Sequence, residues 1–300
     1  MRQVLVLGKT IRTVDVELSE LEKILSIKDD IISIYEFLIQ YSLFCTSLSD
    51  FKKDMYLKCI DMAEDFSKDS FNSSLAFIEA ENSVMHVSAS FIKFTSLLPA
   101  LLAKALPENQ EISDWAKKSI SGMYDTPDGR YLLLCELRNA IAHNKVPITV
   151  STGFSRKLLE PDGILTIGYF LSLDKFIDES MDKANKKSKL QNVKDGLCNQ
   201  KGNVDLVKLL SDVAGIIYSE LILPKTSVLK DVFSNKKKLY IDSLVSNEIL
   251  LPDEIYISHV EYEKELLYSA NVLNRAENLM ENIKRPIKAT SVTIAPSLVR

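Results

Sequence analysis

Glycine is scarce in this sequence, and that scarcity limits the folds that the chain can adopt. Only 9 of the 300 residues are glycine, about half the usual share. Few glycines permit few tight turns, which argues against a many-stranded sandwich or barrel and against a glycine-rich phosphate loop. The sequence also lacks the motifs of zinc proteases, serine hydrolases and calcium-binding loops.

A strongly positive charge is absent as well. The formal net charge is −4, so any contact with nucleic acid must be local. The four cysteines lack the spacing of metal ligands, and we interpret them as reduced core thiols: Cys45, Cys59, Cys135 and Cys198. We find neither a signal peptide nor an uninterrupted apolar run of membrane-spanning length. These absences predict a soluble cytoplasmic protein with no membrane segment, no metal and no cofactor.

The pattern that is present is that of amphipathic helices. Apolar residues at every third or fourth position predict long helices over residues 19–39, 50–66 and 75–98. Ser19 with Glu22 fits a capping box, Asp50 can cap the second helix, and Pro99 bends or ends the third. A short helix around Trp115 follows. The segment Thr126-Pro127-Asp128-Gly129 is a turn signal, and a further helix runs from Arg130 until Pro147 stops it.

The remainder of the chain mixes strands and helices. Residues 148–152 and 164–173 predict a β-hairpin around Pro161-Asp162-Gly163, and alternating valines within residues 1–16 fit short strands. A helix over residues 204–223 is expected to end at Pro224, helical pieces follow, and the tail from Pro286 is expected to be loose. The sequence predicts a mostly α fold. Residues 1–225 form a helical bundle with a hairpin insertion near 148–173, and residues 226–300 form a helical C-terminal extension or part of the same domain.

The helix that begins at Arg130 carries the most distinctive polar side chains, namely Glu136, Arg138, Asn139 and His143. On a helix Asn139 and His143 share a face, since they are four residues apart. Arg138 lies about 140° around the helix from His143 and roughly 7.5 Å along it, so its long side chain can curl toward the same face. Such groups are costly beside a core unless they are satisfied or used.

This segment resembles the HEPN superfamily, whose hallmark is an arginine followed after four to six residues by a histidine, often with a polar residue directly after the arginine. Here Arg138-Asn139 precedes His143 with four residues between arginine and histidine. The resemblance covers residues 17–146 and the helix at 204–223. It implies a helical bundle that acts as a metal-independent endoribonuclease in toxin–antitoxin, phage-defence or RNA-processing systems, or a relative that has lost catalysis.

The implied reaction is attack of the ribose 2′-OH on the adjacent phosphate of RNA. His143 would exchange the proton, since histidines do so near neutral pH. Arg138 would stabilise the charge of the transition state. Asn139 would hold His143 or a phosphate oxygen, and Glu136 would orient Arg138. One histidine does not easily serve as base and acid together, so we expect a homodimer with a shared cleft.

The predicted partners are RNA, a second copy of the chain, and an antitoxin or other defence-system protein. Lys145 and Arg130 are the predicted RNA-binding residues beside the motif. The basic runs at 186–189 and 236–238 fit phosphate contacts or merely solvated faces, and His86 fits a core or boundary position. Two alternatives stay open: a catalytically silent HEPN-like module that binds a protein or nucleotide, and an unrelated helical adaptor in which the motif is accidental.

Overall fold

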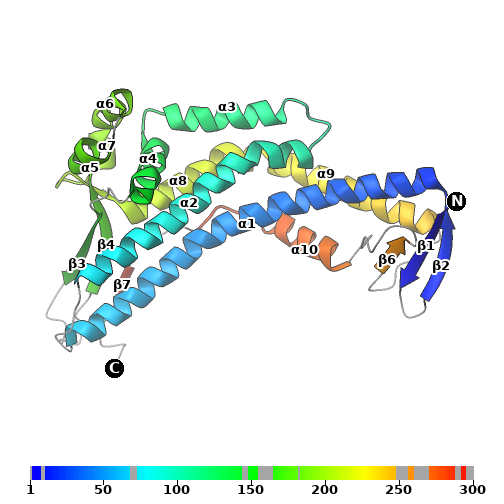
Figure 1. The fold of residues 1–300 in the computed structure, drawn as a ribbon, viewed down its shortest axis with the longest axis horizontal. Helices are drawn as coiled ribbons and strands as arrows, with labels where there is room; N and C mark the ends of the chain where they lie inside the picture. The colour runs from blue at the N-terminus through cyan, green and yellow to red at the C-terminus, as the bar shows by residue number, and fades with distance from the viewer. Residues whose placement is uncertain are drawn as a thin grey trace. The chain divides into compact units, whose positions relative to one another are not determined.

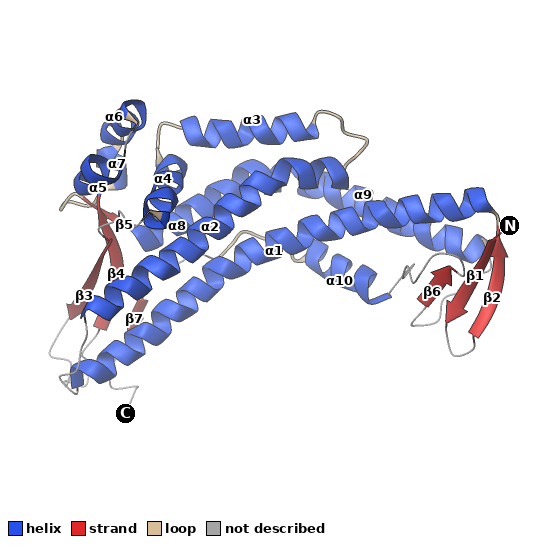
Figure 2. Cartoon of the chain, viewed as in Figure 1, coloured by secondary structure: helices blue, strands red, loops and turns tan. Residues whose placement is uncertain are grey.

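The fold is mostly α, as the sequence predicts (Figure 2). The computed structural model describes residues 2–7, 11–67, 73–143, 148–154, 165–181, 183–247, 256–259, 270–287 and 292–294. The helices are α1 (Leu18–Ser67), α2 (Ser73–Ala105), α3 (Ile112–Asp125), α4 (Arg130–Ala142), α5 (Leu173–Ser180), α6 (Ala184–Asn192), α7 (Lys194–Leu197), α8 (Leu206–Ile217), the π-helical turn η1 (Tyr218–Ile222), α9 (Leu223–Ser246) and α10 (Ala270–Glu281). The strands are β1 (Arg2–Leu7), β2 (Ile11–Val16), β3 (Ile148–Phe154), β4 (Leu165–Ser172), β5 (Asn203–Asp205), β6 (Tyr256–His259) and β7 (Val292–Ile294).

The chain divides into two compact units, neither of which is continuous in sequence. Unit 1 comprises Met1–Ser42, Leu97–Lys117 and Ile222–Lys284. Unit 2 comprises Leu43–Ser96, Lys118–Leu221 and Arg285–Arg300. Both α1 and α2 contribute residues to each unit. The predicted division into residues 1–225 and 226–300 stays a prediction.

Unit 1 combines a small sheet with helices α9 and α10. The sheet is antiparallel in the order β2-β1-β6, so the strands predicted within residues 1–16 are present. In this unit the Tyr41 hydroxyl of α1 donates a hydrogen bond to the Lys284 carbonyl at 2.6 Å. Lys236 of α9 forms ion pairs with Asp30 at 2.8 Å and with Glu108 at 3.6 Å. These contacts join segments that are far apart in the sequence.

Unit 2 contains the predicted hairpin. Strands β3 and β4 pair antiparallel from Ile148 opposite Leu171 to Phe154 opposite Leu165. The predicted turn at residues 161–163 lies outside the described residues. Strands β5 and β7 also pair with β4. The tail was predicted to be loose from Pro286, and that prediction is wrong for β7, because Val292–Ile294 completes the sheet with antiparallel hydrogen bonds.

The core of unit 2 is built from aromatic and aliphatic side chains of α1, α2, α4 and α8. Phe44 of α1 lies against Phe91 and Phe94 of α2, with ring centroids 4.7 and 5.1 Å apart. Further along α1, Phe51 meets Tyr169 of β4 with ring centroids 6.0 Å apart. Helix α8 contacts both α4 and β4. The hairpin and the central helices therefore share one apolar core.

Helix α1 continues through Asp50, where the sequence analysis placed a helix start. Its 50 residues run from Leu18 to Ser67, so the two predicted helices are one. Neither glycine nor proline occurs within this span, and Phe44, Leu48 and Phe51 are all buried on both sides of Asp50. Asp50 itself is exposed and pairs with Lys53 at 3.3 Å. Ser19 lies inside the first turn of α1 rather than before it.

Two prolines do not end helices where the sequence suggested. Pro99 lies inside α2, which continues to Ala105. Pro224 lies in the first turn of α9 rather than after the end of a helix. The preceding π-helical turn η1 joins α8 to α9 without a loop. A wider turn accommodates the proline ring, which would otherwise clash with the carbonyl four residues earlier.

Helices α1 and α2 each contain a stretch that is long and apolar enough to cross a membrane, judged by length and composition alone. The stretches are Leu18–Asp61 and Ile78–Ala105, with 44% and 39% of their most apolar windows buried inside the protein. The core helices of soluble proteins pass the same test. The cytoplasmic location therefore stays a prediction.

Candidate functional site

Helix α4 carries the predicted catalytic residues and begins at the predicted turn. Gly129 adopts a left-handed conformation with φ of 65°, and its N–H donates to the Thr126 carbonyl at 3.3 Å. The Asp128 carboxylate accepts a hydrogen bond from the backbone N–H of Arg130 at 3.0 Å. From there, residues 131–134, Leu137 and Ala140 are buried.

Glu136 is the best satisfied of the four predicted catalytic residues. Its side chain is only 15% exposed, and it forms an ion pair with Lys186 of α6. The Tyr124 hydroxyl of α3 donates a second hydrogen bond to the same carboxylate oxygen at 3.1 Å. Burial raises the pKa of Tyr124. Burial also lowers the pKa of Lys186, but the bonds to Glu136 and Tyr124 outweigh it and raise that pKa overall. Glu136 thus holds Lys186, and its predicted role of orienting Arg138 stays a prediction.

Arg138 and Asn139 lie together, with the Arg138 Nη1 donating to Asn139 Oδ1 at 3.1 Å. The arginine side chain therefore curls toward the face of Asn139, as its length permits. Among the described residues the Arg138 Nε is buried and has no hydrogen-bond partner. A buried guanidinium N–H without an acceptor is costly. The protein alone leaves this guanidinium incompletely satisfied.

His143 is exposed and lies at the very end of α4. The last helical residue is Ala142, and His143 caps the helix with φ of −107° and ψ of 14°. Its backbone N–H donates to the Ala140 carbonyl at 3.1 Å. The predicted helix extended further, to Pro147, which lies outside the described residues. No described contact joins His143 to Arg138 or Asn139, so their convergence stays a prediction.

Of the two predicted RNA-binding residues, only Arg130 lies within the described residues. Arg130 is 30% exposed and already paired, with Asp128 at 2.9 Å and with Asp212 of α8 at 3.4 Å. These carboxylates neutralise its charge and tie the start of α4 to α8. Lys145 lies outside the described residues. Arg130 is thus placed as a structural link between two helices, and a phosphate would have to compete with two carboxylates for it.

Sequence reasoning missed a polar cluster around the buried side of α4. The hydroxyls of Thr95 and Tyr131 are 2.8 Å apart, and Cys135 lies one turn beyond Tyr131. Burial raises the pKa of the Cys135 thiol to about 11 and also raises the pKa of Tyr131. The single available signal was the helical spacing of four residues between Tyr131 and Cys135, which cannot reveal Thr95 on another helix.

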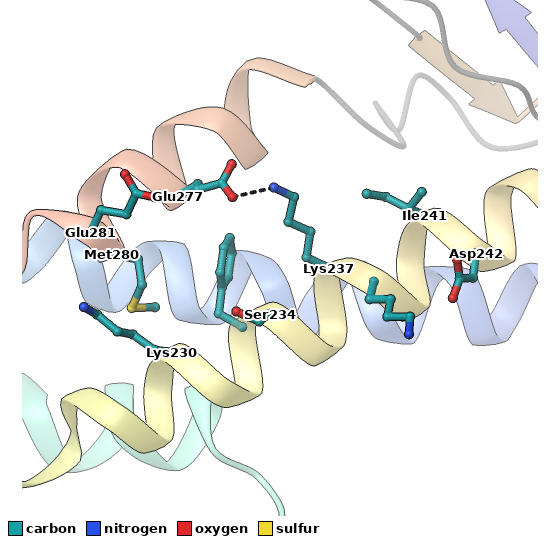
Figure 3. Close-up of a pocket in the computed structure, with 10 residues that line it drawn as sticks. Lys230, Ser234, Lys237, Ile241, Asp242, Glu277, Met280 and Glu281 are labelled. Carbon is teal, nitrogen blue, oxygen red and sulfur yellow. Dashed lines mark hydrogen bonds and ion pairs between the residues drawn. The ribbon is translucent and has the colours of Figure 1, made fainter.

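A pocket of about 420 Å³ lies in unit 1 between α9 and α10 (Figure 3). Phe233 and Met280 give it an apolar floor, and Lys237 of α9 pairs with Glu277 of α10 at 2.7 Å. Its lining contains three lysines and three acids, so it favours no ligand of one charge. It belongs to a different unit from α4.

Metal ligands do not gather in the described part of the chain, where no group of three or more His, Cys, Asp or Glu residues could hold an ion. His86, expected at a core or boundary position, is exposed on α2. Comparison with protein-family models, with curated proteins and with solved structures finds no match for this chain. The function must therefore be inferred from the residues of α4 and their surroundings.

Proposed function

We propose that this protein is a metal-independent endoribonuclease of the HEPN type, acting as a toxin or phage-defence effector in the cytoplasm. The observation that supports the proposal is the guanidinium of Arg138. Its Nη1 reaches Asn139 at 3.1 Å, while its buried Nε has no acceptor among the described residues. A phosphate oxygen is the acceptor that a planar guanidinium fork matches best, and it would bind at the outer nitrogens, because the Nε is closed to solvent. An exposed histidine ends the same helix.

The proposed reaction is transesterification followed by release of the chain end. A base takes the proton of the ribose 2′-OH, and the 2′ oxygen forms a bond to phosphorus. The bond from phosphorus to the 5′ oxygen breaks, and an acid gives that oxygen a proton. The products are a 2′,3′-cyclic phosphate and a 5′-OH. Arg138 stabilises the charge on the phosphoryl oxygens, and His143 supplies one of the two proton transfers.

The test is cleavage of total cellular RNA by the purified protein in the presence of EDTA. Replacement of a group that stabilises the transition state typically costs 10²–10³-fold in rate. We therefore expect His143→Ala and Arg138→Ala each to lower cleavage by at least about 100-fold. The RNA fragments cut by the wild type should carry a 2′,3′-cyclic phosphate at one new end and a 5′-OH at the other.

Matched controls come from residues of the same type elsewhere in the chain. His86 is exposed on α2, and Arg275 is exposed on α10. His86→Ala and Arg275→Ala should cleave RNA at the wild-type rate. If the wild type leaves RNA intact while it is folded, catalysis is excluded, and the silent binding module becomes the better description.

A further inference from the structure

Helix α6 carries charges of one sign only. Residues 183–192 contain Lys183, Lys186, Lys187 and Lys189 and no aspartate or glutamate, within a chain whose formal charge is −4. Its only buried residue is Leu190. In an acidic protein such a segment is a local site of positive potential.

Two of these lysines attach α6 to the rest of unit 2. Lys186 pairs with Glu136 of α4, and Lys189 pairs with Asp125 of α3 at 2.5 Å. The two lysines are three residues apart and share one face of α6. Their positive charges are neutralised by these carboxylates. This face of α6 is therefore directed at α3 and α4.

The other two lysines have no ion-pair partner among the described residues. Lys183 is the exposed N-cap residue of α6, and Lys187 is half-buried in its first turn. On an ideal helix Lys187 lies about 100° around the axis from Lys186. Lys183 and Lys187 are four residues apart, so they project from neighbouring positions on the same side of α6. Their charges remain available to an anion.

The anchoring contact places this basic surface beside the proposed catalytic residues. Glu136 lies seven residues before His143, two turns along α4 on the same face and about 10 Å away. Figure 1 shows α6 with α5 and α7 next to α4. The carbonyl end of α4 carries a partial negative charge, which repels a phosphate near His143. A neighbouring cationic surface offsets that repulsion.

We propose that α6 binds the phosphate backbone of the RNA, through Lys183 and Lys187, while Lys186 and Lys189 fix the helix on α3 and α4. This inference rests on the proposed endoribonuclease function. It moves the backbone contact from Arg130, whose guanidinium is held by Asp128 and Asp212, to two lysines that no carboxylate of the described residues neutralises. The ligand is single-stranded RNA, which these lysines recognise by the charge of its phosphates rather than by its base sequence.

The test measures binding separately from cleavage. The probe is a single-stranded RNA whose 2′-hydroxyls are replaced by fluorine, so that it binds without being cut. Each phosphate contact on single-stranded nucleic acid contributes about 0.7 to the slope of log Kd against log salt. The double variant Lys183→Gln/Lys187→Gln should lose about 1.4 of that slope and bind about tenfold more weakly at 0.15 M salt.

A matched double variant distinguishes binding at α6 from a general effect of positive charge on RNA affinity. Lys230 and Lys238 of α9 are exposed, lack ion-pair partners among the described residues and belong to unit 1. Lys230→Gln/Lys238→Gln removes the same charge and should keep the wild-type slope. With cleavable RNA, Lys183→Gln/Lys187→Gln should raise KM and leave kcat unchanged, because neither lysine touches the reacting atoms.

The outcomes distinguish the two proposals. If the wild type binds and cuts RNA but both double variants share its salt slope, the role of α6 is overturned and the nuclease proposal stands. If both double variants lose affinity equally, binding follows net charge and α6 has no special role. If the wild type does not bind the probe at any salt concentration, both proposals fail. Unchanged thermal unfolding of the double variants shows that their effects do not arise from misfolding.

Discussion

At the residue scale, the polar side chains of α4 differ in how completely the protein satisfies them. Glu136 has two partners from α3 and α6. Arg138 has one partner and a buried N–H without an acceptor among the described residues. His143 is exposed at the end of the helix. Glu136 therefore serves the fold, whereas a ligand contact of Arg138 or His143 stays a proposal.

Cys135 offers a test of burial around this helix through the dependence of stability on pH. Its pKa is raised from 9.0 to about 11 because burial disfavours the thiolate. Between these values the unfolded chain loses the thiol proton while the folded chain keeps it. The free energy of unfolding is therefore expected to fall as the pH rises from 9 to 11, by on the order of 2 kcal/mol from this group.

The measurement is urea-induced unfolding at several pH values from 8 to 11, with Cys135→Ala as the comparison. The variant should be less stable at pH 8, since it loses buried atoms, but its stability should decline less steeply with rising pH. Lys186 also has a raised pKa and contributes to the remaining decline in both proteins. Parallel curves for the wild type and the variant would show that Cys135 ionises normally in the folded protein.

At the element scale, the start of α4 depends on a glycine. Gly129 has φ of 65°, and a Cβ atom built there would lie 2.7 Å from the Val193 Cγ2. The left-handed conformation costs another residue about 1–2 kcal/mol, and overpacking costs about 1–3 kcal/mol. Because Val193 directly follows α6, a side chain at position 129 would collide with the end of the basic segment.

Gly129→Ala is expected to lower the free energy of unfolding by about 2–4 kcal/mol, measured by urea denaturation. Gly122 provides the control, because it lies within α3 and a Cβ atom there meets nothing within 4 Å. Gly122→Ala should raise stability by about 0.5–1 kcal/mol through helix propensity. Equal stabilities for the two variants would contradict the strained turn at Gly129.

At the scale of the whole molecule, the proposed chemistry needs two proton-transfer groups, whereas each chain places one histidine at the end of α4. A two-fold dimer would bring a second His143 and a second Arg138 to one shared site. We therefore predict that the active species has twice the 33.8 kDa mass of the chain. Sedimentation equilibrium measures this mass directly.

Mixing experiments test whether the two chains share the site. An excess of inactive His143→Ala chains should suppress wild-type activity, because mixed dimers contain only one His143. The same excess of His86→Ala chains should not suppress it. A monomer that keeps full activity at every concentration would contradict the shared cleft.

The sequence by itself determined the elements whose signals are local. Repeated apolar residues predicted the buried faces at Phe51, Met55 and Cys59 and at Ala80, Val84 and Val87, and all six are buried. Turn-forming residues predicted the turn before α4, and two runs of strand-forming residues predicted the pairing of β3 with β4. These predictions succeeded because helix and hairpin periodicity depends on residues only a few positions apart.

The tertiary structure alone decided the contacts between distant segments. Strand β7 pairs with β4 although more than 100 residues separate them, and β6 pairs with β1 across most of the chain length. Lys186 reaches Glu136 fifty residues earlier, and no local pattern links them. Likewise, continuous packing on both sides of Asp50 overrode its capping preference. Local propensities are worth a few tenths to about one kcal/mol per residue, and tertiary burial outweighs them.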